Sequence, residues 1–200
     1  MSLMKDKLKF EVPSWNQIHK MLINQTEKIL SDKFIPDTII AITRGGWIPA
    51  RLLSDLLEVS NITTIRIEFY LDLCKTRKKP ILTQKLTEQI KSKKILLVDD
   101  VTDSGKSLQV AKNHILKKNP AILKIATLYK KPKSKIEPNF YEKITKQWII
   151  FPWDIKETSR KLWEQTHNIK TIKNKEINLK KASLTKTLIN KFLKEINEEK

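Results

Sequence analysis

An α/β fold with a central, mostly parallel sheet flanked by helices is predicted from three features of the sequence. Short apolar runs with the length of strands alternate with longer runs that have helical periodicity. The chain has only three glycines, and all of them stand at two strand-to-helix junctions: Gly45, Gly46 and Gly105. Folds of this kind bind their ligands at the carboxyl ends of the strands, so these two junctions are the predicted site.

The first elements follow from caps and periodicity. Ser14 and Gln17 have the spacing of a capping box, and the apolar positions after them predict a helix to about Lys33. The stretch TIIAI at 38–42 predicts a short buried strand. A leucine-rich stretch at 48–57 predicts the helix that follows it, which gives one strand, loop and helix unit.

The middle of the chain predicts a second such unit. Apolar and polar residues alternate over 62–70, ending with Phe69 on the apolar side, which predicts a half-buried strand. The basic segment 74–80 has no periodicity and is predicted to be a mobile loop, and a short helix is expected over 83–92. A buried strand at 94–98 and a helix at 106–118 then enclose the second glycine junction.

The last part of the chain changes character. The stretches ILKIATLY at 122–129 and QWIIF at 147–151 predict two more strands, with a proline-containing connection over 131–141 between them. We expect residues 1–154 to form the main domain, with a small hood over about 130–154. Residues 155–200 are rich in Lys, Asn and Glu, and their apolar spacing at 184–196 predicts an added helical tail.

Composition narrows the classes of function without choosing one. The formal charge is +18, which predicts a nucleic acid, an anionic membrane surface or a highly phosphorylated small molecule as partner, or else a lysine-rich solvated surface. One cysteine excludes an internal disulfide, and three scattered histidines give no transition-metal cluster. No run is long and apolar enough to cross a membrane, so we expect a cytoplasmic protein.

The second junction, LVDDVTDSGKS, ends like a nucleotide-binding P-loop but lacks its first glycine. Asp100 stands at that position, and a second carboxylate at Asp99 would repel a triphosphate. The helix that follows offers free N–H groups to a monophosphate, to which hydroxyl groups can add hydrogen bonds. Acids can accept hydrogen bonds from a ribose diol, directly or through a divalent cation. A sugar diol next to a 5-phosphate fits both halves of the motif.

This junction, in the context ILLVDDVTDSGKSL, resembles the phosphoribosyl pyrophosphate (PRPP) signature of the type I phosphoribosyltransferases. The resemblance implies their fold, with the ribose and Mg²⁺ at Asp99 and Asp100. It implies a general acid/base, Asp103, beside the purine N7. The implied 5-phosphate contacts are Thr102, Ser104, Gly105, Lys106 and Ser107.

Two further motifs are similar to the 6-oxopurine branch of that family. TRGG resembles its pyrophosphate loop, which implies pyrophosphate contacts from Thr43, Arg44, Gly45 and Gly46 and a peptide before Arg44 that is sometimes cis. KKP at 130–132 and WIIFPWD at 148–154 resemble the base-binding hood of bacterial xanthine-guanine enzymes and, more closely, of their archaeal relatives. The resemblance implies purine contacts from Lys131, Trp148, Ile149 and Asp154.

Some of these roles have alternatives. Lys130 competes with Lys131 for the base, Arg44 could be a surface arginine, and Trp148 could be core packing, as we expect of Trp153. The implied loop that closes over the diphosphate contains Lys75, Arg77, Lys78 and Lys79; the alternative is a solvated charged loop.

The resemblance covers residues 13–154 and implies a Mg²⁺-dependent purine salvage enzyme. Such an enzyme would transfer the 5-phosphoribosyl group of PRPP to guanine, xanthine or hypoxanthine and act as a homodimer or homotetramer. Adenine is disfavoured because an ammonium can only donate a hydrogen bond. The alternative is a PRPP-binding regulator of the same fold that binds RNA or DNA. The role of Lys106, which replaces a glycine of many members, and that of the tail are left open.

Overall fold

The computed structural model describes residues 10–71, 78–165, 191 and 194–195. These residues belong to two compact units. The sheet unit is Ile18–Lys146, and the terminal unit combines Met1–Gln17 with Gln147–Lys200. No helix in the described ranges is long and apolar enough to span a membrane.

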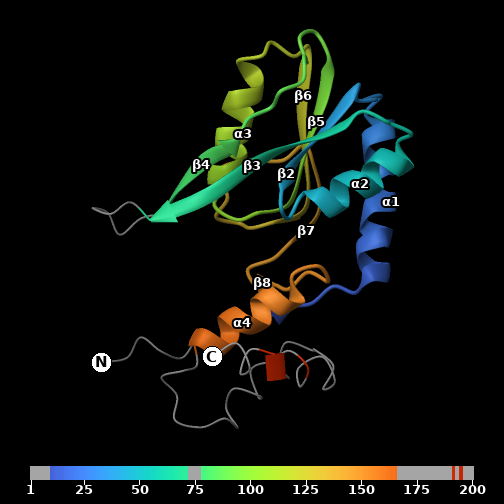
Figure 1. Ribbon diagram of the computed structural model, residues 1–200. Coiled ribbons are helices and arrows are strands. Elements are labelled where there is room, and N and C mark those ends of the chain that lie inside the picture. Colours follow the sequence, from blue (N-terminus) through green and yellow to red (C-terminus); the bar gives the residue numbers. More distant parts are fainter. Residues whose placement is uncertain (1–9, 72–77, 166–190, 192–193, 196–200) are drawn as a thin grey trace. The chain divides into compact units, whose positions relative to one another are not determined.

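The sheet unit contains a six-stranded sheet in the order β4-β3-β2-β5-β6-β7. Only the β3–β4 pair is antiparallel, which confirms the mostly parallel α/β fold. In Figure 1, α1 and α2 lie on one side of the sheet and α3 lies on the other. The strands are β2 (Thr38–Thr43), β3 (Ile62–Leu71), β4 (Lys78–Gln84), β5 (Lys94–Thr102), β6 (Ile122–Lys130) and β7 (Phe140–Ile144), and the helices are α1 (Trp15–Ser31), α2 (Trp47–Leu56) and α3 (Lys106–Leu116).

The helices pack on the sheet through the spacing of their apolar residues. In α3 the buried positions are Leu108, Ala111 and Ile115, which share one face of the helix. They join a core cluster that includes Ile65 of β3 and Leu97 of β5, both with no exposed surface. This burial fixes the start of α3 at the carboxyl end of β5.

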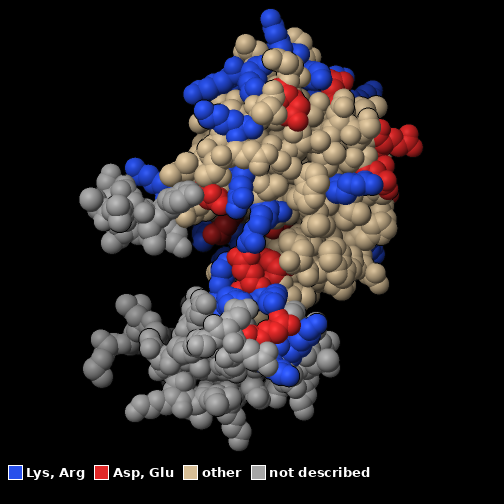
Figure 2. Space-filling model, viewed as in Figure 1, with Lys and Arg blue, Asp and Glu red and all other residues tan. Residues whose placement is uncertain are grey.

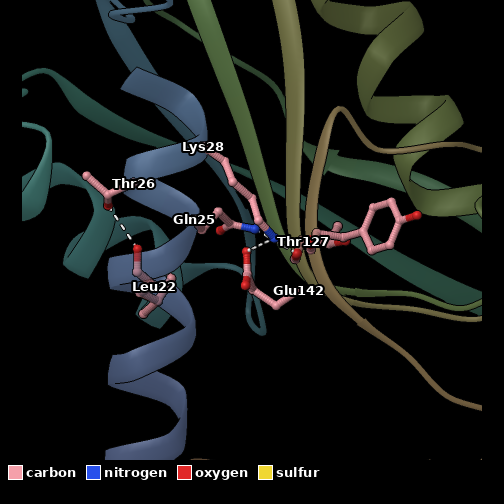
Figure 3. Close-up of polar contacts among 7 residues, drawn as sticks. Leu22, Gln25, Thr26, Lys28, Thr127 and Glu142 are labelled. Atoms are coloured by element: carbon pink, nitrogen blue, oxygen red, sulfur yellow. Dashed lines mark hydrogen bonds and ion pairs between the residues drawn. The ribbon is translucent and has the colours of Figure 1, made fainter. Parts of the chain in front are cut away.

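The helix α1 is also attached to the sheet by polar contacts (Figure 3). The buried Gln25 side chain donates to the carbonyl of Thr127 at 2.9 Å. The Lys28 ammonium donates to the carbonyl of Tyr141 at 3.1 Å and to the Glu142 carboxylate at 2.9 Å. A buried amide without a partner would be costly, so these contacts favour one position of α1 against β6 and β7.

The terminal unit contains a small two-stranded sheet. β1 (Phe10–Glu11) pairs in parallel with β8 (Trp148–Ile149), and α4 (Ile155–Gln165) follows. The predicted capping box forms within this unit: the Ser14 N–H donates to the Gln17 side chain at 2.8 Å, and the Gln17 N–H donates to the Ser14 hydroxyl at 3.2 Å.

Several expectations about single elements were wrong. Residues 78–84 form β4 and not part of a loop or helix, because their backbone pairs with β3. The expected helix at 83–92 is absent from these residues, which the structure describes as strand, turns and irregular backbone. β7 begins at the end of the connection expected over 131–141 and runs past it, and the strand expected at 147–151 is only the two residues of β8. The apolar spacing at 184–196 falls almost entirely outside the described residues.

Candidate active site

A pocket of about 500 Å³ lies at the carboxyl end of β5, as the α/β pattern predicted. Its lining is Phe69 of β3 together with the continuous segment from Asp99 to Leu108. β5 runs on to Thr102, so the acidic pair Asp99 and Asp100 lies on the end of the strand and not in the loop that the sequence predicted. Phe69 is 46% exposed, although the alternation of β3 placed it on the apolar side.

The turn between β5 and α3 has the form of a phosphate cradle. Gly105 precedes the first residue of α3 and has φ of 80°, a left-handed conformation that glycine adopts without strain. The helix then starts with Lys106 and Ser107, whose backbone N–H groups have no partner within the helix. Such an N-terminus attracts a phosphate. The exposed Lys106 side chain forms no ion pair with any residue that the structure describes.

The two adjacent acids differ in their surroundings. Asp99 is buried, and one of its oxygens accepts the N–H of Asp100 at 3.0 Å. Burial, and after it the charge of Asp100, raises the pKa of Asp99 well above its ordinary value. Asp100 is only half-buried and accepts the N–H of Val101 at 2.7 Å. Asp100, the less buried of the two, is therefore the acid better placed to meet a ligand.

The first glycine junction lies directly against these acids. A Cβ atom on Gly45 would collide with the Asp100 carboxylate, and one on Gly46 would come within 2.9 Å of the Asp99 Cα. The peptide between Thr43 and Arg44 is cis, as the resemblance implied. The Thr43 hydroxyl donates to the carbonyl of Ile65 at 3.1 Å, and Arg44 is exposed. The structure thus brings the two glycine junctions together at one end of the sheet.

The segment 131–136 after β6 packs on the phosphate cradle. The Lys131 N–H donates to the carbonyl of Thr102 at 2.9 Å. The hydroxyl groups of Thr102 and Ser134 lie 2.6 Å apart, and the Lys135 N–H donates to the carbonyl of Ser104 at 3.3 Å. The buried Thr102 hydroxyl is thus bonded to the protein. The Ser104 side chain is half-buried at the pocket, and its hydroxyl accepts the N–H of Lys106 at 3.5 Å.

The lysines around this segment have different partners. The Lys130 ammonium forms an ion pair with Glu137 and lies over the ring of Tyr141, 5.3 Å from its centroid. The Lys133 ammonium lies 3.1 Å from an oxygen of Asp103. The Lys130 ammonium is therefore held at Glu137 and Tyr141.

The remaining predicted contacts belong to the terminal unit. Ile149 is buried and Trp148 is 50% exposed, so core packing does not account for Trp148 within the terminal unit. Trp153 stacks on Phe151 with centroids 4.8 Å apart, which agrees with a packing role. Asp154 belongs to the same unit, where its carbonyl accepts the N–H of Thr158 at the start of α4.

The predicted diphosphate loop lies partly outside the described residues. Lys75 and Arg77 fall there, whereas Lys78 and Lys79 are in β4.

A family model for the phosphoribosyl transferase domain matches residues 14–160. The chain belongs to the phosphoribosyltransferase family. The matched range contains both glycine junctions, the acidic end of β5 and the segment after β6.

Curated relatives and solved structures agree with this membership. A xanthine-guanine phosphoribosyltransferase of Desulfotalea psychrophila is 34% identical over 154 residues, which cover 76% of this chain and 91% of the relative. The purine phosphoribosyltransferase of Pyrococcus horikoshii Ot3 has 34% identity and a TM-score of 0.66, covering 72% of this chain and 93% of its own. A Neisseria gonorrhoeae protein solved with bound ppGpp has 26% identity and a TM-score of 0.67, covering 74% and 90%.

Three side chains at or beside the pocket were not predicted from the sequence. The alternation of β3 assigns Phe69 to the core, and Lys133 and Ser134 lie in a connection that no pattern distinguishes. The proline at 132 was the one local signal. It predicts a turn but does not indicate which residues the turn contacts. The positions of Lys133 and Ser134 depend on pairing between β5 and β6, and that of Phe69 on pairing between β3 and β4.

Proposed function

We propose that this phosphoribosyltransferase acts in purine salvage, transferring the 5-phosphoribosyl group of PRPP to guanine, xanthine or hypoxanthine with release of pyrophosphate. The observation that carries the proposal is the junction of Gly45 and Gly46 with the acidic end of β5, beside the phosphate cradle at Gly105. A ligand with a diphosphate, a diol and a 5-phosphate matches those three parts in turn. The names of the bacterial and archaeal relatives support the purine as acceptor.

Each part of the proposed PRPP site has a physical task. The N-terminus of α3 holds the 5-phosphate through backbone N–H groups, with the Ser104 and Ser107 hydroxyls available to add hydrogen bonds. Arg44 and the backbone at Gly45 and Gly46 hold the leaving diphosphate. Carbon–oxygen cleavage at the anomeric carbon leaves an oxocarbenium-like sugar, so correctly placed charges are what lower the barrier.

The acidic pair also fits a Mg²⁺ ion that binds together with PRPP. Mg²⁺ takes one or two protein carboxylates and completes its shell with water and substrate oxygens. No group of three or more acidic, histidine or cysteine side chains suited to a metal exists among the described residues, and none is needed for such an ion. Asp100 is the main proposed ligand, with Asp99 behind it. The ion would neutralise charge on the leaving diphosphate.

The purine end of the site is proposed from charge and position within the sheet unit and, for residues of the terminal unit, from the family resemblance alone. Asp103 is exposed at the pocket and is the proposed acceptor of the purine N7 proton. Lys131 donates to the 6-oxo group. An ammonium can only donate a hydrogen bond, so it suits the 6-oxo group and not the 6-amino group of adenine. Trp148 stacks on the base, Ile149 supplies main-chain contacts, and Asp154 faces the purine 2-position. The functional enzyme is proposed to be a homodimer or homotetramer.

Turnover with single bases tests the proposal. The protein is mixed with PRPP and Mg²⁺, and nucleotide formation is followed with guanine, xanthine, hypoxanthine or adenine in turn. We expect turnover with at least one 6-oxopurine and little with adenine. Asp103→Asn should lower kcat by about 100-fold or more while PRPP binding is kept. Absence of turnover with every base would refute the enzyme, and an unchanged kcat in Asp103→Asn would remove that residue from the mechanism.

A second candidate is a PRPP-binding regulator that binds RNA or DNA. Figure 2 shows lysine and arginine side chains gathered at the top of the view, over the amino ends of β5 and β6. Four lysines at this end form no ion pair with any carboxylate in the described ranges: Lys91, Lys93, Lys117 and Lys118.

Binding of a labelled oligonucleotide across a salt series tests this candidate. The double variant Lys91→Glu/Lys117→Glu should weaken binding more than Lys20→Glu/Lys146→Glu, which changes the net charge equally at other positions. Equal weakening in the two variants would indicate attraction by net charge alone.

A further inference from the structure

The carboxylate of Asp103 has one lysine partner and one open oxygen. The Lys133 ammonium lies 3.1 Å from Oδ1, and both side chains are largely exposed, Lys133 by 69% and Asp103 by 58%. The other carboxylate oxygen accepts no hydrogen bond from any residue in the described ranges. An incoming ligand therefore reaches an oxygen of Asp103 without first breaking a contact within the sheet unit.

Lys133 differs from an ordinary surface lysine because the backbone on both sides of it is held. Pro132 fixes one backbone torsion immediately before it. The Lys131 N–H is bonded to Thr102, and the Ser134 N–H donates to the carbonyl of Lys131 at 3.0 Å, which closes a turn around Lys133. The Ser134 hydroxyl, in contact with Thr102, also accepts the N–H of Ile136 at 3.2 Å.

The same contacts bind this turn to the loop that carries Asp103. Thr102 precedes Asp103 and bonds to both Lys131 and Ser134. A Cβ atom on Gly105, two residues after Asp103, would come within 2.9 Å of the Ile136 backbone nitrogen. The separation between the backbones at 103 and 133 is thus set by packing on both sides, and the ion pair bridges two anchored segments.

We propose that Lys133 is a positioning residue that holds the Asp103 carboxylate in the orientation that receives the purine. The inference rests on the proposed function of Asp103. An exposed aspartate turns among several rotamers, and a general base works only when its oxygen is within hydrogen-bond reach of the proton. Lys133 holds Oδ1, which leaves Oδ2 for the N7 proton. The lysine acts through Asp103 and takes no part in bond making.

The chain offers a matched control in the same segment. Lys135 is exposed, has the same charge, and its side chain forms no ion pair with any described residue. Lys133→Met should lower kcat for the 6-oxopurine by about two- to fivefold, the range expected for one exposed ion pair, with KM for PRPP unchanged. Lys135→Met should leave both constants as in the wild type. The charge-keeping Lys133→Arg should restore most of the lost kcat.

A double-mutant cycle separates this role from a general effect on the fold. In the Asp103→Asn background, Lys133→Met should have no further effect on kcat, because the carboxylate it orients is gone. The same loss in both backgrounds would overturn the proposal, as would equal effects of Lys133→Met and Lys135→Met. A fall in Tm of more than about 4 °C in Lys133→Met would also count against it, because loss of one exposed ion pair does not lower stability that much.

Failure of this inference differs from failure of the proposed function. If Asp103→Asn loses turnover and Lys133→Met keeps it, only the role of Lys133 is refuted. If no 6-oxopurine is turned over by the wild type, or if Asp103→Asn is fully active, the proposed role of Asp103 fails and the inference fails with it.

Discussion

Substituting the two adjacent glycines by alanine should separate stability from ligand binding. A Cβ atom on Gly46 would meet backbone: the carbonyl oxygen of Val98, that of Ile42 at 2.8 Å and the Asp99 Cα at 2.9 Å. The three atoms nearest to a Cβ atom on Gly45 all belong to the side chain of Asp100, with Oδ1 at 2.8 Å. Backbone in a sheet cannot yield as a carboxylate can, so the two variants should fail in different ways.

The contacts set the expected magnitudes. Overpacking against fixed atoms costs about 1–3 kcal/mol, so Gly46→Ala should lower Tm by roughly 4–8 °C at the middle of that range. Gly45→Ala should leave Tm within about 2 °C, because rotation of the Asp100 carboxylate relieves the clash and the alanine restricts the unfolded chain. The displaced carboxylate no longer faces PRPP, and loss of one such charged contact should raise the Kd for PRPP with Mg²⁺ by about 10-fold or more.

Thermal unfolding and calorimetric titration with PRPP and Mg²⁺ measure the two effects on the same preparations. The expected pattern is a stable Gly45→Ala that binds poorly and a destabilised Gly46→Ala. If Gly45→Ala binds PRPP as tightly as the wild type, Asp100 is not the ligand-facing acid. If it unfolds at the same lowered temperature as Gly46→Ala, the argument from mobile and fixed neighbours is wrong.

Two further predictions use other side chains. Lys131→Met should raise KM for the 6-oxopurine by about 10-fold or more. Lys130→Met should change this KM little, because the Lys130 ammonium is paired with Glu137. Equal KM values for the two variants in steady-state kinetics would contradict the prediction. Burial, followed by nearby lysines, lowers the pKa of His114, whose neutral ring accepts the N–H of Leu86. As pH falls through about 6.5, His114 therefore binds a proton in the unfolded chain before it does so in the folded chain, which lowers the free energy of unfolding. The Tm of the wild type should thus drop between pH 7.5 and 5.5 more steeply than that of His114→Gln.

The elements predicted correctly from the sequence are those set by residues close together in the chain. The start of α1 follows from Ser14 and Gln17, whose side chains satisfy backbone groups three residues away. The strand β2 is buried over residues 38–42 and β6 over residues 125–129, and both segments are mostly apolar. Such buried apolar runs can be recognised without knowledge of the neighbouring strands. Most of the α/β architecture therefore follows from local patterns in the sequence.

The errors lie where distant partners decide the structure. β4 is a strand because Lys78–Gln84 pairs with the end of β3, and nothing in its own basic sequence indicates this. The sequence pattern favours a loop at Asp99 and Asp100 because adjacent acids are uncommon in strands. Pairing with β6, through Asp99 with Thr127 and Thr102 with Lys130, extends β5 past them. The motif thus identified the residues of the site, while the backbone that presents them depended on tertiary pairing.

The outer position of β4 bears on how copies of this chain associate. An outermost strand exposes unpaired N–H and C=O groups that another chain could extend into a continuous sheet. β4 contains Lys78 and Lys79 followed by Pro80, which has no N–H to donate. Charge and proline at an exposed edge discourage strand addition. Oligomers of this protein should therefore be built through other surfaces, and this edge should protect the protein from growing into β-aggregates during expression and storage.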